Sequence, residues 1–186
     1  MKIHFKNNLL NMVTIFVVTM FFSCESDINK VQKLSKTSFI PSGEADTINL
    51  KYTDSGQIKS ILKSPKMLDY GNIINPFTEF PKGINVTLFD NKGNITTIVA
   101  DYAISYKKTS IIDLQGNVKI SSDTGKRLET SQLYFDQKNE WFFTEKHFKY
   151  TDEAGGYLEG PGVDFSKDFK IFNMQQSSGE VNTIDQ

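Results

Sequence analysis

The chain has few of the residues from which metal sites and disulfides are built. Its 186 residues include one cysteine, Cys24, and two histidines, His4 and His147. A single cysteine excludes an internal disulfide framework and a thiolate metal cluster. Only His147 lies beyond the N-terminal segment, and one histidine cannot build a zinc site alone. Because it ends the polar run Glu145–His147, we expect it on the surface.

Motifs of the common enzyme classes are missing as well. The sequence has no phosphate-binding loop ending in Gly-Lys-Ser/Thr, no His-Glu-x-x-His and no Gly-x-Ser-x-Gly. Residues Asp123–Gly125 spell the aspartic-protease triplet, but the polar residues on both sides favour a hairpin turn. We therefore expect no catalytic residue, no metal and no cofactor.

Neither sign of charge is in large excess. The chain has 21 Lys and Arg residues against 22 Asp and Glu residues, a net charge of −1. Residues 1–23 contain Lys2 and Lys6 and no acid, so the remainder is slightly acidic. Nucleic-acid binding depends on a basic surface that displaces counterions. This class of function is therefore excluded.

The N-terminal segment has a hydrophobic run that is too short to span a membrane. It extends from Leu9 to Phe22, about 14 residues where a transmembrane helix needs roughly 20. With Lys2 and Lys6 before it, the run predicts a secretory signal over residues 1–23. Cys24 follows directly and resembles the lipidated cysteine of bacterial lipoproteins. We expect lipidation of Cys24, a linker over residues 24–44, and attachment to a membrane outside the cytoplasm; an uncleaved signal anchor is the alternative.

From residue 45 onward, apolar residues repeat at every second position, as in strands. In residues 112–120 one face is apolar and the other is polar, and residues 84–89 alternate in the same way. In residues 97–104 the alternation predicts that Ile98, Ala100, Tyr102 and Ile104 share a face. No segment has a helical stripe. We predict an all-β domain over residues 45–180 and a tail over residues 181–186.

Five polar segments predict turns, because Asp caps its own turn and Gly adopts positive φ. They are residues 54–56, 90–93, 123–125, 136–139 and 152–155. Their spacing predicts strands of roughly 8–14 residues in hairpin order, as in a meander or jelly roll. Gly116, inside an alternating strand, predicts a bulge or a close approach of two backbones.

Several motifs follow one another along the predicted strands. They are Asp101-Tyr102-Ala103, Ile112-Asp113-Leu114-Gln115-Gly116-Asn117-Val118, Arg127-Leu128-Glu129-Thr130, Leu133-Tyr134-Phe135-Asp136, and the glycine-rich stretch 155–162 with Phe165. In this order they resemble the OstA/LptC family of lipopolysaccharide-export proteins. The resemblance covers residues 45–180 and implies a twisted, partly open β-jelly roll of long antiparallel strands. Membrane attachment favours LptC over the soluble bridge protein LptA, although many LptC proteins keep a transmembrane helix in place of a lipidated cysteine.

The resemblance also implies which residues bind lipid and partners. Lipid would contact inward side chains, for which the candidates are Ile98, Tyr102, Ile112, Leu114, Leu133, Phe135 and Phe143. The N-terminal edge, near residues 47–52, would meet an inner-membrane ABC transporter, and a C-terminal edge would add a strand of an LptA-like bridge protein. Candidates at that edge are Gly160, Phe169, Ile171, Phe172 and Met174. Gly160 is expected at a close approach or at unusual dihedrals; a turn glycine before Pro161 is the alternative.

These implications give the expected function. The chain would receive lipopolysaccharide from the transporter and pass it to the bridge protein, while tethered in the periplasm, most simply to the inner membrane. One alternative is a β-domain lipoprotein that binds glycan or protein at the surface or in the periplasm. A surface hydrolase is the weakest alternative, because it needs paired carboxylates in a polar cleft. Without the family resemblance, a closed sandwich core without a ligand would be favoured.

Overall fold

A computed structural model of the chain describes residues 40–90 and 92–180. The predicted signal, Cys24, most of the linker and the tail at 181–186 lie outside the described residues. Every regular element within them is a strand, which confirms the all-β prediction. The described part accordingly has no helix of the length and hydropathy that crossing a bilayer requires.

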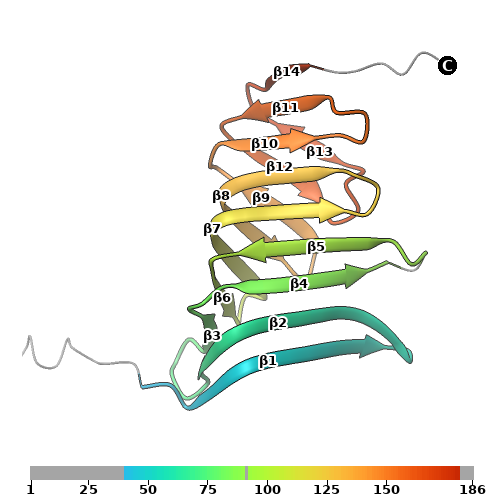
Figure 1. Cartoon of the computed structure of the whole chain (residues 1–186). Helices are drawn as coiled ribbons and strands as arrows, with labels where there is room; N and C mark the ends of the chain where they lie inside the picture. Colours follow the sequence, from blue (N-terminus) through green and yellow to red (C-terminus); the bar gives the residue numbers. More distant parts are fainter. Residues whose placement is uncertain (1–39, 91, 181–186) are drawn as a thin grey trace, which may run out of the picture. The chain divides into compact units, whose positions relative to one another are not determined.

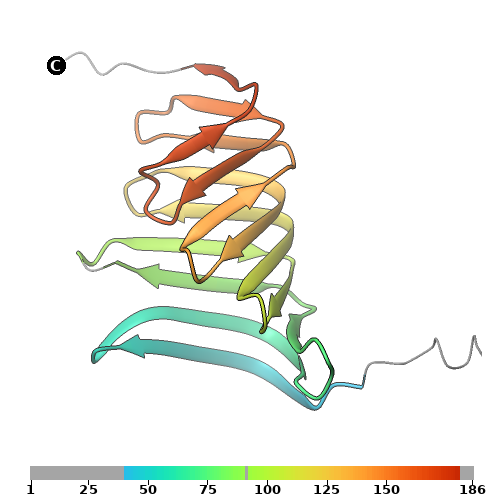
Figure 2. The same ribbon diagram turned by 180° about the vertical axis from the view of Figure 1, so that it is seen from behind.

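The strands form one 14-stranded antiparallel sheet that is folded over on itself (Figures 1 and 2). Their bounds are β1 Gly43–Asp54, β2 Gln57–Tyr70, β3 Phe77–Phe80, β4 Ile84–Phe89, β5 Ile95–Ala100, β6 Tyr102–Tyr106, β7 Ile111–Ser122, β8 Arg127–Asp136, β9 Trp141–Thr144, β10 Phe148–Thr151, β11 Tyr157–Gly160, β12 Val163–Ser166, β13 Phe172–Met174 and β14 Ser178–Glu180.

The four long strands cross a corner and belong to two half-sheets. The front half joins residues 48–63 of β1 and β2 to β4 and β5, and then residues 118–130 of β7 and β8 to β10, β11 and β14. The back half joins the other ends of these long strands to β3, β6, β9, β12 and β13. The two halves face each other across an interior, as in a jelly roll.

Local sequence explains why the strands bend at the corner. In the β1–β2 pair, Thr47 adopts φ 52° and lies between the registered pairs on either side, opposite Pro65. Proline has no N–H to donate to the ladder, so the pairing weakens there. In β7 the register shifts between Gln115 and Val118, and Gly116 has φ 72°. The bulge predicted at Gly116 is confirmed.

The five predicted turns are confirmed, because each joins two paired neighbouring strands. Three of the five aspartates, Asp90, Asp136 and Asp152, accept hydrogen bonds from N–H groups of their own turns. Asp123 Oδ2 accepts instead from the N–H of Ile95, and Asp54 Oδ1 accepts from the Ser55 hydroxyl. Asp90 Oδ1 accepts hydrogen bonds from the N–H groups of Lys92 (2.7 Å) and Asn94 (2.9 Å). Asp152 Oδ1 does the same for Ala154 and Gly156. The triplet Asp123–Gly125 lies in the β7–β8 turn, as predicted.

Two expectations about the strands are wrong. Only β1, β2, β7 and β8 have 10–14 residues, while the other strands have three to six. The short strands result from the corner, which interrupts the chain between β5 and β6 at Asp101. Because of this interruption, the alternation of inward and outward side chains in residues 97–104 is reversed after Asp101. Ala103, paired with Leu114 and Phe80, is the inward residue, so Tyr102 and Ile104 face outward.

Candidate functional site

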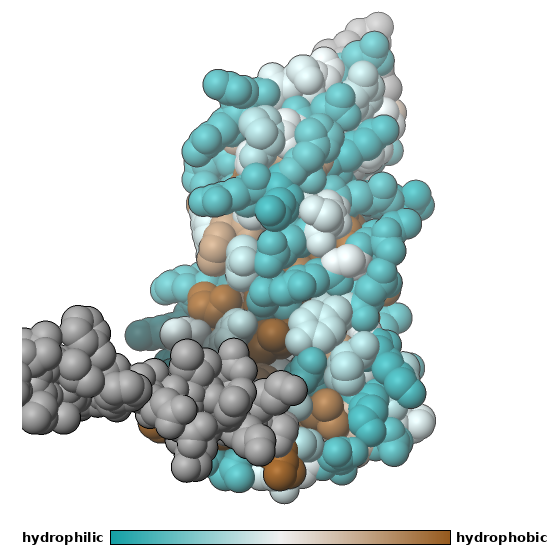
Figure 3. All heavy atoms as spheres, turned by 90° about the vertical axis from the view of Figure 1, so that its left-hand side faces the viewer, coloured by the Kyte–Doolittle hydropathy of each residue, from teal (hydrophilic) through white to brown (hydrophobic). Residues whose placement is uncertain are grey.

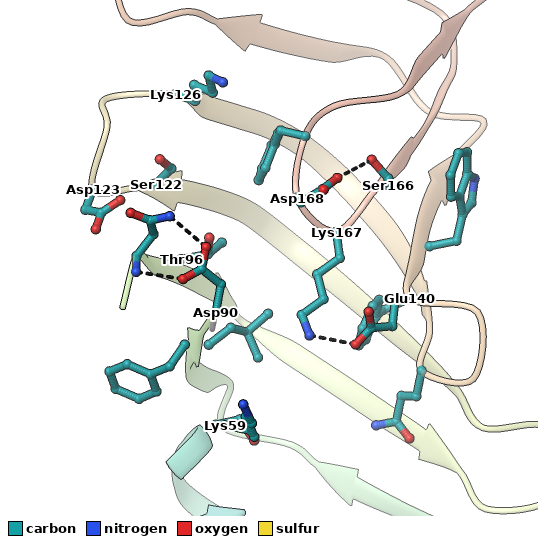
Figure 4. A pocket seen from close by; sticks show the side chains of 18 of the residues that line it. Lys59, Asp90, Thr96, Ser122, Asp123, Lys126, Glu140, Ser166, Lys167 and Asp168 are labelled. Atoms are coloured by element: carbon teal, nitrogen blue, oxygen red, sulfur yellow. Dashed lines mark hydrogen bonds and ion pairs between the residues drawn. The ribbon is translucent and has the colours of Figure 1, made fainter. Parts of the chain in front are cut away.

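An open groove lies between the free ends of the two half-sheets. The ends of β1 and β2 and the β4–β5 and β7–β8 turns form its front lip, and the β8–β9 and β12–β13 turns form its back lip. Its volume is about 1210 Å³. Figure 4 shows Asp90, Thr96 and Ser122 on one side of it and Glu140 and Lys167 on the other. This volume exceeds that of most small-molecule sites, which range from about 300 to 1,000 Å³.

One row of inward side chains crosses the whole back half, and its members change from polar to aromatic along the row. Strand register places the members side by side in the order Asp69, Thr78, Ser105, Ile112, Phe135, Phe142, Phe165 and Phe172. We call these eight residues the inner row. It is polar near the N-terminal strands, aliphatic at β7 and aromatic from β8 to β13. The neighbouring rings stack with centroids 4.4, 5.1 and 5.0 Å apart.

The inner row explains why the interior is closed at one end and open at the other. Large rings fill the space between the half-sheets toward the C-terminal strands, where Phe142, Phe148 and Phe165 are completely buried. The small polar members of the row cannot fill that space toward β1. There Leu50 and Tyr52, whose partners Leu62 and Ser60 place them on the inward face, are 50% and 63% exposed. The faces are therefore sealed over part of their length only.

The polar end of the inner row is fixed by one ion pair. Lys107 Nζ lies 2.5 Å from Asp69 Oδ1, and the Thr78 hydroxyl donates to the same oxygen at 3.0 Å. The hydrogen bond from Lys107 holds the pKa of Asp69 below its ordinary value of 3.8. Asp69 is therefore charged at neutral pH, and this end of the inner row stays polar.

The outer surface contrasts with the interior. Seen from the corner side, most of the described surface is hydrophilic, with scattered hydrophobic residues (Figure 3). On the outer face of β7 and β8, Asp113 accepts hydrogen bonds from the amides of Gln115 (2.7 Å) and Gln132 (2.9 Å). The core residues of the long strands thus face the interior, while a few large hydrophobic residues, among them Ile58 and Val99, stay exposed.

A comparison with protein families supports an identification from this fold and groove. The family model described as lipopolysaccharide-assembly, LptC-related, matches residues 12–178, which is most of the chain. The chain belongs to the LptC family. No curated protein matches the chain in sequence. Membership places the protein in lipopolysaccharide transport, with the periplasmic, inner-membrane association that is general for LptC proteins, and LptC is not known as an enzyme family.

Five of the seven predicted lipid-contact residues face the interior of this LptC domain. Ile98, Leu114 and Leu133 are almost fully buried in the core. Ile112 and Phe135 are partly buried members of the inner row, and Phe135 also lines the groove. Contact with lipid stays a prediction for all five. The position of Phe135 on the groove wall makes it the strongest candidate among them.

The other two, Tyr102 and Phe143, point away from the interior. Tyr102 pairs with Gln115 on the outer face, and its hydroxyl donates to Glu79 Oε1 at 2.7 Å. Burial of the phenol, together with this bond, raises the pKa of Tyr102. Phe143 stacks on Tyr134, with ring centroids 5.1 Å apart. The expectation that both face inward is wrong. The break between β5 and β6 at Asp101 turns Tyr102 outward. The pairing of Phe135 with Phe142 makes Phe142 the inward residue, so Phe143 faces outward.

Sequence reasoning missed the residues that line the open part of the groove. These include Tyr52, Ser60, Leu88 and Thr96, which register and the apolar core place on the inward face of the front half. Leu88 belongs to the alternating segment 84–89, so its inward direction was visible in the sequence. The sequence did not show that Leu88 lies at the opening of the groove, because the opening is formed by strands that are distant in the chain.

The predicted partner edges are edges of the sheet. Within the described residues β1 pairs only with β2, and β13 pairs only with β12. Phe172 and Met174 lie in β13 and Ile171, 54% exposed, directly precedes it. Phe169 is buried in the β12–β13 turn. A Cβ on Gly160 would lie 3.1 Å from the carbonyl oxygen of Gln175, so this glycine occupies a close approach; it is also the last residue of β11, next to Pro161.

The described residues contain no grouping of His, Cys, Asp and Glu that could hold a metal ion. His147 is exposed on the connection between β9 and β10, as expected. All buried side-chain nitrogen and oxygen atoms of the described part have hydrogen-bond partners. A second hollow of about 770 Å³ lies beside Thr47 and Pro65, and the groove is the larger of the two.

Proposed function

We propose that the groove receives an acyl chain of lipopolysaccharide while the sugar head stays in solvent at the charged lips. The observation that supports this proposal is the half-open interior, with its inward face exposed at Leu50 and Tyr52. Exposing an acyl chain of about twelve methylenes to water costs ~10 kcal/mol at about 0.8 kcal/mol each. An apolar wall that shields most of the chain removes much of this cost.

The proposal extends to the direction of transfer. The protein takes lipopolysaccharide from an inner-membrane ABC transporter at the β1 end and gives it to an LptA-like bridge protein at the β13 end. Free strand edges at both ends support this, because an unpaired edge can add a strand from another chain. The open end of the groove adjoins β1, where the lipid would enter.

The hydrogen-bond pattern of β13 supports strand addition at this edge. The N–H of Ser166 donates to the Ile171 carbonyl (3.0 Å), and the N–H of Gln175 donates to the Gly162 carbonyl (3.4 Å). Bonded pairs alternate along antiparallel strands, so Asn173 also turns its backbone groups toward β12. The backbone N–H groups of Phe172 and Met174 therefore point outward, toward an added strand.

Attachment through Cys24 completes the proposal. Lipidation at this position would tether the domain to the inner membrane through the linker at 24–44, close to the transporter. Both Cys24 and most of that linker lie outside the described residues. Metabolic labelling with a radioactive fatty acid tests this step, with Cys24→Ser as the unlabelled control.

A transfer assay tests the function as a whole. Full-length protein loaded with labelled lipopolysaccharide is mixed with the bridge protein, and lipid bound to each is measured after separation. We expect lipid to move to the bridge protein faster than it leaves in buffer alone. Failure of the protein to bind lipopolysaccharide, or release at the same rate with and without the bridge protein, contradicts the proposal.

A further inference from the structure

The β12–β13 turn carries a buried aromatic residue in an unusual backbone conformation. Phe169 has φ 57°, in the left-handed region that bulky residues rarely occupy, and its side chain is only 8% exposed. Such a conformation is strained and persists only where surrounding contacts impose it. The contacts around this turn therefore hold the ring of Phe169 in an inward direction.

The ring of Phe169 connects the two half-sheets. Its centroid lies 5.2 Å from that of Phe165 and 5.9 Å from that of Phe172, both in the back half. It lies 6.5 Å from the ring of Tyr150, in β10 of the front half. Phe169 also lines the groove. It therefore stands where the open groove ends and the sealed aromatic core begins.

Several bonds hold the turn in this position. Ser166 Oγ accepts from the N–H groups of Lys170 (3.2 Å) and Ile171 (3.1 Å), and the Phe169 N–H donates to the Ser166 carbonyl (2.9 Å). The turn is also tied to the β8–β9 turn, because Lys167 Nζ lies 2.8 Å from Glu140 Oε1. Figure 4 shows this pair on the back lip.

We propose that Phe169 is the stop that limits how far a bound acyl chain extends along the interior. The chain occupies the open portion beside β1, β2 and β4, and it reaches the β13 edge only when Phe169 leaves the aromatic cluster. This inference rests on the proposed function and adds to it the position of the bound lipid and the residue that sets that position.

Photo-crosslinking at two inward positions tests the stop. A photoreactive amino acid replaces Tyr52, in the open portion, or Met174, which packs on the core beyond Phe169. Each is introduced into the full chain in cells, alone and with Phe169→Gly. Glycine suits the positive φ, so this change removes the ring without straining the turn. Phe169→Leu, which keeps an apolar bulk, and Lys170→Ala, whose side chain is exposed on the same turn, are the matched controls.

We expect lipopolysaccharide adducts at Tyr52 and only background at Met174 when Phe169 is present. With Phe169→Gly, adducts at Met174 should rise to the yield at Tyr52, whereas both control variants should stay at background. Phe169→Asn, which also tolerates a left-handed φ, replaces the glycine variant if thermal melting shows that the latter does not fold.

Two results would overturn the stop. One is equal labelling at Tyr52 and Met174 in the protein that retains Phe169. The other is unchanged background at Met174 in a folded Phe169→Gly or Phe169→Asn protein that still labels at Tyr52. Absence of adducts at Tyr52 itself would instead overturn the proposed function.

Discussion

The rings of Phe165 and Phe172 lie nearly parallel, 7° apart, with centroids separated by 5.0 Å. They end an inner row that begins with the charged Asp69 at the other end of the same half-sheet. Opposite ends of one domain thereby serve stability and binding. The aromatic end provides the sealed core, and the polar end leaves the space that a ligand can enter.

Truncation of the sealed core should destabilise the protein strongly. Phe142 is fully buried and stacks on both Phe135 and Phe165. Phe142→Ala should cost about 3–5 kcal/mol of unfolding free energy, measured by urea denaturation. Ser105→Ala, in the polar part of the same row, should cost less than about 1 kcal/mol. Similar losses for both variants would contradict the division of the row.

Filling the groove should block lipid without unfolding the domain. Thr96 lines the groove on the inward face of β5, and Thr97 faces outward on the next position. Thr96→Phe should abolish co-purification of lipopolysaccharide with the full chain. Thr97→Phe adds the same side chain to the opposite face and should leave bound lipid unchanged. Equal retention of lipid by both variants would place the lipid elsewhere.

Removal of an outward backbone donor from β13 should prevent strand addition. Met174→Pro deletes an N–H group that the pairing pattern directs away from β12, so the internal ladder stays intact. Co-purification of the bridge protein should be lost. Asn173→Ala is the control: it removes the side-chain bond to Asp164 (2.7 Å) but keeps every backbone donor. Unaltered capture by the Met174→Pro protein would exclude β13 as the binding edge.

The turn that carries Phe169 should weaken in acid. Hydrogen bonds from Lys170 and Ser166 lower the pKa of Asp168 from 3.8 to about 2. A depressed folded-state pKa stabilises the protein above the unfolded-state value, and this contribution disappears as the pH falls through about 2. The carboxylate is half exposed, so the effect is small. The melting temperature of Asp168→Asn should lie below that of the parent near pH 6 and approach it near pH 2; a constant difference would contradict this assignment.

The corner should tolerate no side chain at Gly83. Its φ is 80°, and a Cβ there would lie 2.6 Å from the carbonyl oxygen of Ala100. Gly93 has a similar φ of 87° with no atom within 4 Å of the added carbon. Gly93→Ala should therefore cost only the backbone strain, about 1 kcal/mol. Gly83→Ala should lower the unfolding free energy by clearly more, because strand β5 must shift; equal losses in urea denaturation would refute the steric explanation.

Sequence alone predicted the features that depend on neighbouring residues. The turns followed from Asp and Gly chemistry, and the bulge followed from a glycine within an alternating strand. The inward face of residues 112–120 was also correct on both sides of Gly116, because a bulge in this strand kept Leu114 and Val118 on the interior side.

Features that depend on distant strands could not be predicted. Three aromatic residues follow one another from Trp141 to Phe143, and alternation gives no reason to choose one of them as inward. The pairing of Phe142 with Phe135 makes that choice. The change along the inner row likewise appears only when eight strand positions are aligned, so neither the open end nor the stop at Phe169 could be located from the sequence.

Crosslinking from two adjacent residues of β1 tests most directly whether the groove holds lipid. Tyr52 faces the groove and Lys51 faces outward, and both side chains are exposed to solvent. A photoreactive amino acid at each position in living cells should capture lipopolysaccharide at Tyr52 and not at Lys51. Equal capture at the two positions, or none at Tyr52 in a folded protein, would contradict a lipid carried between the half-sheets.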